Sequence, residues 1–247
     1  MPRRPSASLA CTWLSLAILL WPQSAALAIE GGALARKGDA VARATVTIGT
    51  LVDGGNAIGL NRCSGVLISP ELVLTAAHCV RGNPLAAAVL FFDGSRAVGQ
   101  AIQVVSVARY AVPESDVPSE YVTRLSELSL DTAVLRLAAP IAGRRPIPIE
   151  RRADRLPSRL RLAGTGLSGS RSGVLKTASL QPLLVTPSGL VIARALGAQV
   201  CQGDSGGPVV AEGRRGATVV GVASAVITRE PPCGDTVVIA PANPGAW

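Results

Sequence analysis

The chain has 247 residues, a formal net charge of +8 from 24 basic and 16 acidic residues, and only 3% aromatic residues. So few aromatic side chains cannot supply the stacking surfaces of single-strand nucleic-acid binders, and we expect no specific nucleic-acid partner. A basic surface of this kind attracts anionic partners in a non-specific way.

Residues Met1–Ala28 have the three parts of a secretory signal. Arg3 and Arg4 give a positive start, residues 7–21 are apolar, and Ala26-Leu27-Ala28 offers a small-residue cleavage site. The alternative is an uncleaved membrane anchor, but about fifteen apolar residues are fewer than the roughly twenty that a spanning helix needs. We therefore expect an exported protein, secreted or periplasmic, whose mature chain starts at Ile29 without a membrane span.

The remaining chain is a series of short β-branched runs separated by Gly, Pro, Asn and Asp. The expected strands are Ala44–Leu51, Cys63–Ile68, Ala86–Phe92, Ala101–Val107, Thr132–Leu137, Leu160–Ala163, Val174–Leu184, Leu190–Ala195, Pro208–Val210, Ala217–Ala225 and Thr236–Ile239. Strands at this spacing indicate an all-β sandwich or barrel. Because the Pro- and Arg-rich stretch Pro140–Pro157 interrupts the pattern, we expect two halves, 29–140 and 141–247.

One histidine follows the signal, His78, in the segment Thr75-Ala76-Ala77-His78-Cys79. A lone histidine beside a cysteine is ordinarily structural. Far downstream, however, Ser205 lies in Gly203-Asp204-Ser205-Gly206-Gly207-Pro208, among glycines that let the backbone turn tightly. A serine hydroxyl needs a base within hydrogen-bond reach to act as a nucleophile at neutral pH. We therefore predict Ser205 as nucleophile and His78 as its general base.

Such a base also needs a carboxylate that holds its tautomer and stabilises the imidazolium formed during attack. Asp131 directly precedes the apolar run Thr132–Leu137, where a side chain can point into a cleft. We predict that Asp131 orients His78.

These three segments resemble, in the same order, the motifs of the trypsin-like serine peptidases, which are Thr-Ala-Ala-His-Cys, an Asp-Ile-Ala-Leu-like segment and Gly-Asp-Ser-Gly-Gly-Pro. The resemblance covers about residues 29–236. It implies two six-stranded antiparallel β-barrels with the active site between them, and an oxyanion hole made by the N–H groups of Gly203 and Ser205. It also implies that Ser224 hydrogen-bonds Asp131. The implied activity is hydrolysis of protein or peptide substrates through an acyl-enzyme, with no metal or cofactor, by a chain that we expect to be a monomer.

Four cysteines follow the signal, and four cysteines allow three pairings. The alternative is a zinc site built from the same residues. The family resemblance implies the pairs Cys63–Cys79 and Cys201–Cys233.

The resemblance also suggests how the protein is switched on. Family members are activated by a new chain terminus that pairs with the aspartate before the nucleophile, and Ile29-Glu30-Gly31-Gly32 directly follows Ala28. We expect signal removal itself to create this terminus, with Asp204 as its partner. The alternative is that Asp204 is an ordinary turn residue.

The predicted substrate pocket departs from that of trypsin, which has an aspartate six residues before the nucleophile. Here that position is Gln199, and the usual Ser-Trp-Gly wall is replaced by Ser224-Ala225-Val226. A neutral, narrowed pocket favours small or medium uncharged residues, unless Asp235 enters it and restores a preference for basic ones. The alternative function is a catalytically silent binding module that keeps the barrels.

Overall fold

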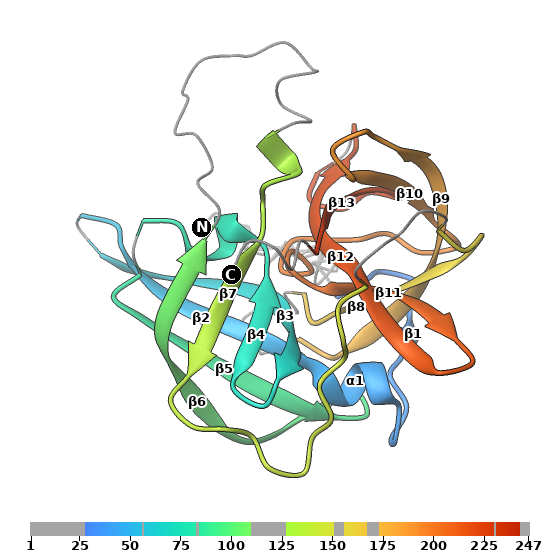
Figure 1. Ribbon diagram of the computed structural model, residues 1–247. Helices are drawn as coiled ribbons and strands as arrows, with labels where there is room; N and C mark the ends of the chain where they lie inside the picture. The colour runs from blue at the N-terminus through green and yellow to red at the C-terminus, as the bar shows by residue number, and fades with distance from the viewer. Residues whose placement is uncertain are drawn as a thin grey trace, which may run out of the picture.

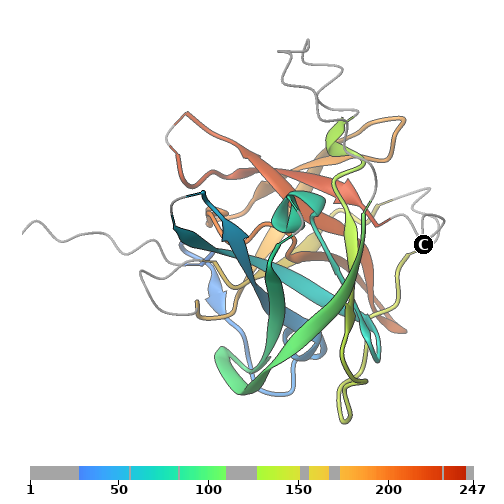
Figure 2. The same ribbon diagram turned by 90° about the vertical axis from the view of Figure 1, so that its left-hand side faces the viewer.

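The computed structural model describes residues 28–55, 57–82, 84–109, 127–150, 156–166, 173–229 and 231–242. It consists mainly of antiparallel strands arranged in two units that lie side by side (Figures 1 and 2). The predicted signal, apart from Ala28, lies outside the described residues. Within the described ranges, no helix is long and apolar enough to cross a membrane.

The first unit is a closed barrel with the strand order β2-β3-β4-β7-β6-β5. Its strands are β2 (Thr45–Asp53), β3 (Ile58–Ser69), β4 (Leu72–Thr75), β5 (Ala86–Asp93), β6 (Arg96–Arg109) and β7 (Ala133–Leu137). Alternate side chains of β2, such as Val46 and Ile48, are fully buried, as expected where one face of a strand lines the core. They pack in one apolar cluster with Val89 and Leu135.

The second unit also closes on itself, because β8 pairs with both β9 and β11. Its strands are β8 (Leu160–Gly164), β9 (Lys176–Val185), β10 (Val191–Ala195), β11 (Pro208–Gly213), β12 (Gly216–Ile227) and β13 (Thr236–Pro241). A two-residue strand, β1 (Ala33–Leu34), adds to the edge of β9. Its core includes Ile29, Leu162, Leu180 and Ile239.

The connection after β7 is bound to both barrels. The N–H of Ile147 donates to the carbonyl of Leu67 in β3 at 2.9 Å. In the second barrel, the N–H of Val219 donates to the carbonyl of Pro148 at 2.8 Å. The linker therefore ties the two barrels together.

The prediction of two six-stranded antiparallel barrels is confirmed. Four elements are additional to the predicted ones: β1, β4, the short helix α1 (Ala40–Ala44) and the 3₁₀ turn η1 (Ala77–Val80). These elements span two to five residues, which is too short for periodicity to distinguish them from loops. The hairpin of β2 and β3 is also longer than predicted, because β3 starts at Ile58 and its largely exposed first residues pair with β2.

Candidate active site

The first barrel brings His78 and Asp131 together. His78 lies in the 3₁₀ turn η1 (Ala77–Val80) that follows β4, and Asp131 lies just before β7. Because β4 and β7 are antiparallel neighbours with Thr75 opposite Ala133, the end of one strand meets the start of the other. Two residues that are 53 positions apart thereby become direct neighbours.

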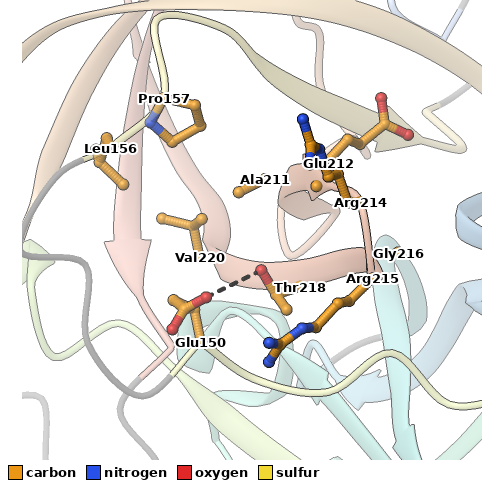
Figure 3. Close-up of a pocket in the computed structure, with 11 residues that line it drawn as sticks. Glu150, Leu156, Pro157, Ala211, Glu212, Arg214, Arg215, Gly216, Thr218 and Val220 are labelled. Atoms are coloured by element: carbon orange, nitrogen blue, oxygen red, sulfur yellow. Dashed lines mark hydrogen bonds between the residues drawn. The ribbon is translucent and has the colours of Figure 1, made fainter.

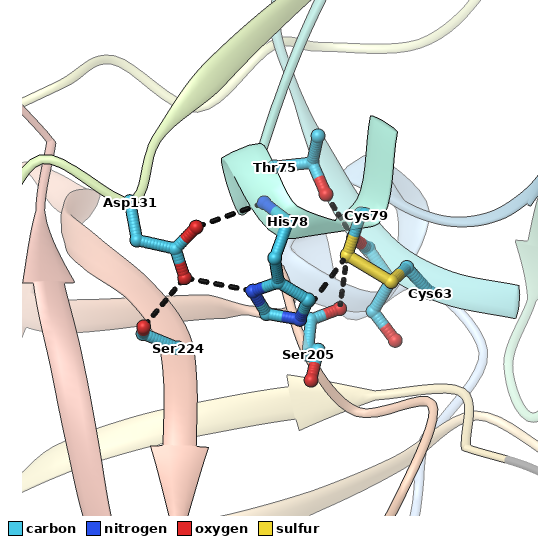
Figure 4. A network of polar contacts seen from close by, with 8 residues as sticks. Cys63, Thr75, His78, Cys79, Asp131, Ser205 and Ser224 are labelled. Carbon is cyan, nitrogen blue, oxygen red and sulfur yellow. Dashed lines mark hydrogen bonds and ion pairs between the residues drawn. A yellow bond between two sulfur atoms is a disulfide. The ribbon is translucent and has the colours of Figure 1, made fainter. Parts of the chain in front are cut away.

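Asp131 holds both the backbone and the ring of His78 (Figure 4). Its Oδ2 lies 2.7 Å from Nδ1 of His78, and its Oδ1 accepts the His78 backbone N–H at 2.9 Å. The hydroxyl of Ser224 in β12 donates to Oδ2 at 2.6 Å, as predicted. Burial alone would raise the pKa of Asp131, but these bonds and the charge of His78 outweigh it, so the pKa lies below its usual value. The carboxylate is thus kept ionised beside the imidazole.

Ser205 lies on the opposite side of the His78 ring from Asp131 (Figure 4). Its carbonyl accepts the N–H of Ser64 in β3 at 2.8 Å. The sulfur of Cys79 is 3.8 Å from both Nε2 of His78 and this carbonyl, so the serine and the ring share one neighbour. Among the described residues, no hydrogen bond joins the Ser205 hydroxyl to His78. His78 and Ser205, which we predicted to lie within hydrogen-bond reach, are neighbours, but the Ser205 hydroxyl is not directed at the His78 ring.

The turn around Ser205 leaves two N–H groups without an acceptor. Asp204 donates to the carbonyl of Cys201, and Gly206 donates to that of Ala223. By contrast, the described residues offer no acceptor to the N–H of Gly203 or Ser205, and Gly203 adopts a φ of 90°. Two free donors beside a serine can stabilise a negatively charged oxygen.

Two residues that the sequence did not indicate hold this turn in place. The hydroxyl of Ser64 donates to the carbonyl of Gly203 at 2.9 Å and accepts the N–H of Thr165 at 2.9 Å. Ser64 is fully buried and Thr165 nearly so. The first barrel thus positions the peptide unit that lies between the two free N–H groups.

Asp204 is completely buried and faces the start of the mature chain predicted from the sequence. Its carboxylate accepts N–H groups from Ile29 at 3.0 Å, Cys201 at 2.9 Å and Gly166 at 3.0 Å. Burial raises the pKa of Asp204 to about 6, although these three bonds act in the opposite direction. The carboxylate therefore lacks a full counter-charge while Ile29 is still joined to Ala28.

The joint between Ala28 and Ile29 is strained. Ile29 has a φ of +30°, which is an outlier for a β-branched residue. Ala28 is 1% exposed, and a Cβ placed on Gly166 would lie only 2.8 Å from its Cα. The intact chain is therefore crowded at this peptide bond.

Both disulfides implied by the resemblance are present, Cys63–Cys79 and Cys201–Cys233. The first links β3 to the His78 turn, and the second links the Ser205 turn to the segment before β13. The sulfurs of Cys63 and Cys79 lie close to His78, but they are bonded to each other and offer no thiolate to a metal ion. The structure thus has the disulfide pairing that the resemblance implies.

Comparison with known proteins assigns the chain to a family. A family model described as Trypsin matches residues 29–242. The chain belongs to the trypsin family. A trypsin of Sarcophaga bullata is 30% identical over 183 residues, which cover 66% of this chain and 67% of that protein. Coagulation factor XII of Sus scrofa is 31% identical over 180 residues, 62% of this chain, and this match spans only 29% of its length.

Solved structures share the fold. HL collagenase superimposes with a TM-score of 0.64 at 18% identity, covering 86% of this chain and 93% of that one. At this identity the likeness shows the fold alone.

Gln199 and Val226, two of the three predicted pocket residues, lie near the second disulfide, whereas Ser224 hydrogen-bonds Asp131. The backbone of Gln199 pairs with that of Glu30, and its side chain is exposed. Val200, 2% exposed, pairs with Gly234, and Val226 packs beside Gly234.

Asp235, the residue that could have restored a basic preference, points elsewhere. Its carboxylate lies 4.0 Å from Nε of Arg194 and accepts the hydroxyl of Thr236 at 3.0 Å. Its side chain is 56% exposed. Asp235 therefore lies at the surface, beside Arg194.

A cavity of about 510 Å³ lies on the second barrel beside the hairpin of β11 and β12 (Figure 3). Leu156, Ala211 and Val220 give it an apolar lining, and Arg214 and Arg215 line it as well. None of the predicted site residues lines it.

Proposed function

We propose that this trypsin-family protein is an exported serine endopeptidase that cleaves peptide bonds through an acyl-enzyme on Ser205. The observation that carries the proposal is the placement of His78 between a buried carboxylate, 2.7 Å from Nδ1, and a serine flanked by two free N–H groups. This arrangement provides a base, an orienting acid and an anion site next to one another.

The Ser205 hydroxyl must first rotate toward Nε2 of His78, a change that substrate binding commonly brings about in such sites. As its oxygen attacks the substrate carbonyl, His78 takes the hydroxyl proton. Asp131 stabilises the resulting imidazolium through Nδ1. The N–H groups of Gly203 and Ser205 receive the negative charge that develops on the carbonyl oxygen, where each donor contributes about 3 kcal/mol.

The acyl-enzyme then forms as the bond to the leaving amine breaks, and His78 returns its proton to the amine nitrogen. Water then hydrolyses the acyl-enzyme. His78 takes a proton from the water, the hydroxide attacks the ester carbon, and Ser205 leaves with that proton. Each residue ends the cycle in the protonation state in which it began.

Cleavage between Ala28 and Ile29 is proposed to activate the enzyme. The cut would turn the Ile29 N–H into an ammonium 3.0 Å from Asp204 and would remove the strained φ, which does not exist in a terminal residue. A buried ion pair of this kind is costly to break, by about 3 to 5 kcal/mol. We expect a chain that starts at Ile29 to be active and one that starts at Ala28 to be far less active.

We also propose that the enzyme cleaves after small or medium uncharged residues. Gln199 carries no negative charge, Val226 would narrow the pocket where the family has glycine, and Asp235 lies 4.0 Å from Arg194 in an exposed pair. A panel of fluorogenic peptides that differ only in the residue before the cut should give the highest kcat/KM for Ala or Val. Highest turnover after Arg or Lys would show that the pocket assignment is wrong.

The acyl-enzyme is tested with an activated ester. The chain starting at Ile29 should release a rapid burst of alcohol that is stoichiometric with protein, followed by slower turnover, and Ser205→Ala should abolish the burst. A correctly folded, disulfide-bonded protein without a burst would be the silent binding module.

A further inference from the structure

Basic side chains gather at the end of the first barrel that lies away from His78. They come from three segments: residues 36–43, which include most of α1, the turn between β5 and β6, and the linker after β7. Their members, which we call the basic face, are Arg36, Lys37, Arg43, Arg96, Arg144 and Arg145. Figure 1 places α1 at the lower end of the first barrel, whereas β4 runs upward to the turn that carries His78.

The three segments are interlocked and form one surface. A Cβ placed on Gly94, in the turn between β5 and β6, would lie 3.2 Å from the backbone nitrogen of Lys37. The guanidinium of Arg43 donates to the carbonyl of Gly143 at 2.7 Å. In return, the guanidinium of Arg144 donates to the carbonyls of Arg43 at 2.6 Å and Phe92 at 2.8 Å.

The positive charge of the basic face is largely unbalanced. Residues 36–43, the turn 93–96 and the linker residues 140–146 contain two acidic residues, and one of them, Asp39, is bound by Arg161 of the second barrel. The other, Asp93, lies 3.6 Å from Lys37 in an exposed pair. Within the described ranges, the five arginines of the basic face form no ion pair. The surface therefore carries an excess of several positive charges.

Arg144 is fixed in a position that brings this charge together. Its guanidinium stacks on the ring of Phe91, 4.5 Å from the centroid, and its two hydrogen bonds hold it there. Burial and, after it, the charge of Arg43 lower the pKa of Arg144. Arg43 and Arg144 are thus held near each other, and the charge of Asp93 offsets their repulsion only in part, so a bound anion would relieve it further.

We propose that the basic face binds a linear anionic polysaccharide that carries sulfate or carboxylate groups. Guanidiniums pair with such oxyanions through two parallel hydrogen bonds, and a repeating polyanion can contact several of them at once. Single-stranded nucleic acid fits less well, because the nearby Phe91 is buried under Arg144 and offers no stacking surface. This inference concerns a surface remote from Ser205 and does not depend on catalysis.

Fluorescence anisotropy with a labelled heparin-derived oligosaccharide tests the inference, using Ser205→Ala protein in about 0.15 M salt. The double variant Arg36→Gln/Arg145→Gln removes two exposed charges of the basic face without touching Arg144. The matched control, Arg194→Gln/Arg229→Gln, removes two exposed charges from the second barrel. We expect the first variant to raise the Kd at least about tenfold and the control to change it less than about threefold.

Two results would overturn the proposal. Equal losses of affinity in both variants would mean that only the overall net charge acts. No binding at this salt concentration would mean that the basic face is not a polysaccharide site. Equally tight binding of a single-stranded oligonucleotide of the same charge would mean that the surface does not select a polysaccharide.

Discussion

At the scale of single residues, Asp131 does more than balance a charge. It holds the backbone of His78 through Oδ1 and the ring through Oδ2, and Ser224 steadies Oδ2 from the other barrel. Orientation and tautomer of the imidazole thus depend on one buried carboxylate, whose lowered pKa keeps it ionised.

Asp131→Asn should therefore reduce kcat/KM by about 10³- to 10⁴-fold, because an amide can present a donor to Nδ1 and favour the wrong tautomer. Ser224→Ala removes one supporting bond and should cost only about tenfold. Steady-state kinetics on one peptide, with circular dichroism to verify folding, measures both. Equal effects of the two substitutions would contradict these roles.

At the scale of elements, the Ser205 turn is shaped by its fit against β3 and β4. Gly206 has a φ of +77°, and a Cβ there would collide with the hydroxyl of Thr75 and the carbonyl of Ser64. A side chain at this position would push the turn away from the first barrel, and with it the two free N–H groups.

Gly206→Ala should accordingly lower the free energy of unfolding by at least about 3 kcal/mol, from the left-handed φ and the collision together. Gly82→Ala is the matched control, because Gly82 has a φ of +69° but no heavy atom within 4 Å of a Cβ. It should cost only about 1 to 2 kcal/mol. Urea denaturation distinguishes the two, and equal losses would mean that the turn tolerates displacement.

The sequence predicted the barrels and the three site residues because both leave local signals: short alternating runs bounded by turn residues, and motifs in a fixed order. Ser64 and Thr165 left none. Ser64 contacts Thr165 and Gly203, which are 101 and 139 positions away, and only the docking of the two barrels brings them together. The orientation of the Ser205 hydroxyl and the burial of Ala28 likewise depend on tertiary packing.

At the scale of the whole molecule, the Ile29 segment couples the chain terminus to the core of the second barrel. Ile29 is fully buried there, and the Asp204 carboxylate is shielded from water beside it. In a chain still joined to Ala28, Asp204 has a pKa of about 6 against the usual 3.8, so the folded state binds its proton more tightly than the unfolded state does.

For the uncut chain, this contribution to stability is fully present below about pH 4 and is lost as the pH rises through about 6, a loss of about 3 kcal/mol. A chain starting at Ile29 supplies an ammonium that lowers the pKa of Asp204, so this chain should lose much less stability as the pH rises. Urea unfolding of Ser205→Ala protein at pH 4.5 and 7, for chains starting at Ala26 and at Ile29, measures the difference.

Asp204→Asn in the longer chain provides the control, because it removes the titrating group and with it this pH dependence. The same pH dependence in both chains would mean that the new terminus does not reach Asp204.

The measurement that tests the central claim most directly is mass spectrometry of the purified protein after reaction with a serine-directed fluorophosphonate. The account predicts one modification, on Ser205, in a chain that starts at Ile29, and its loss in His78→Ala. A correctly processed, disulfide-bonded protein that stays unlabelled, or that is labelled equally well without His78, would contradict it.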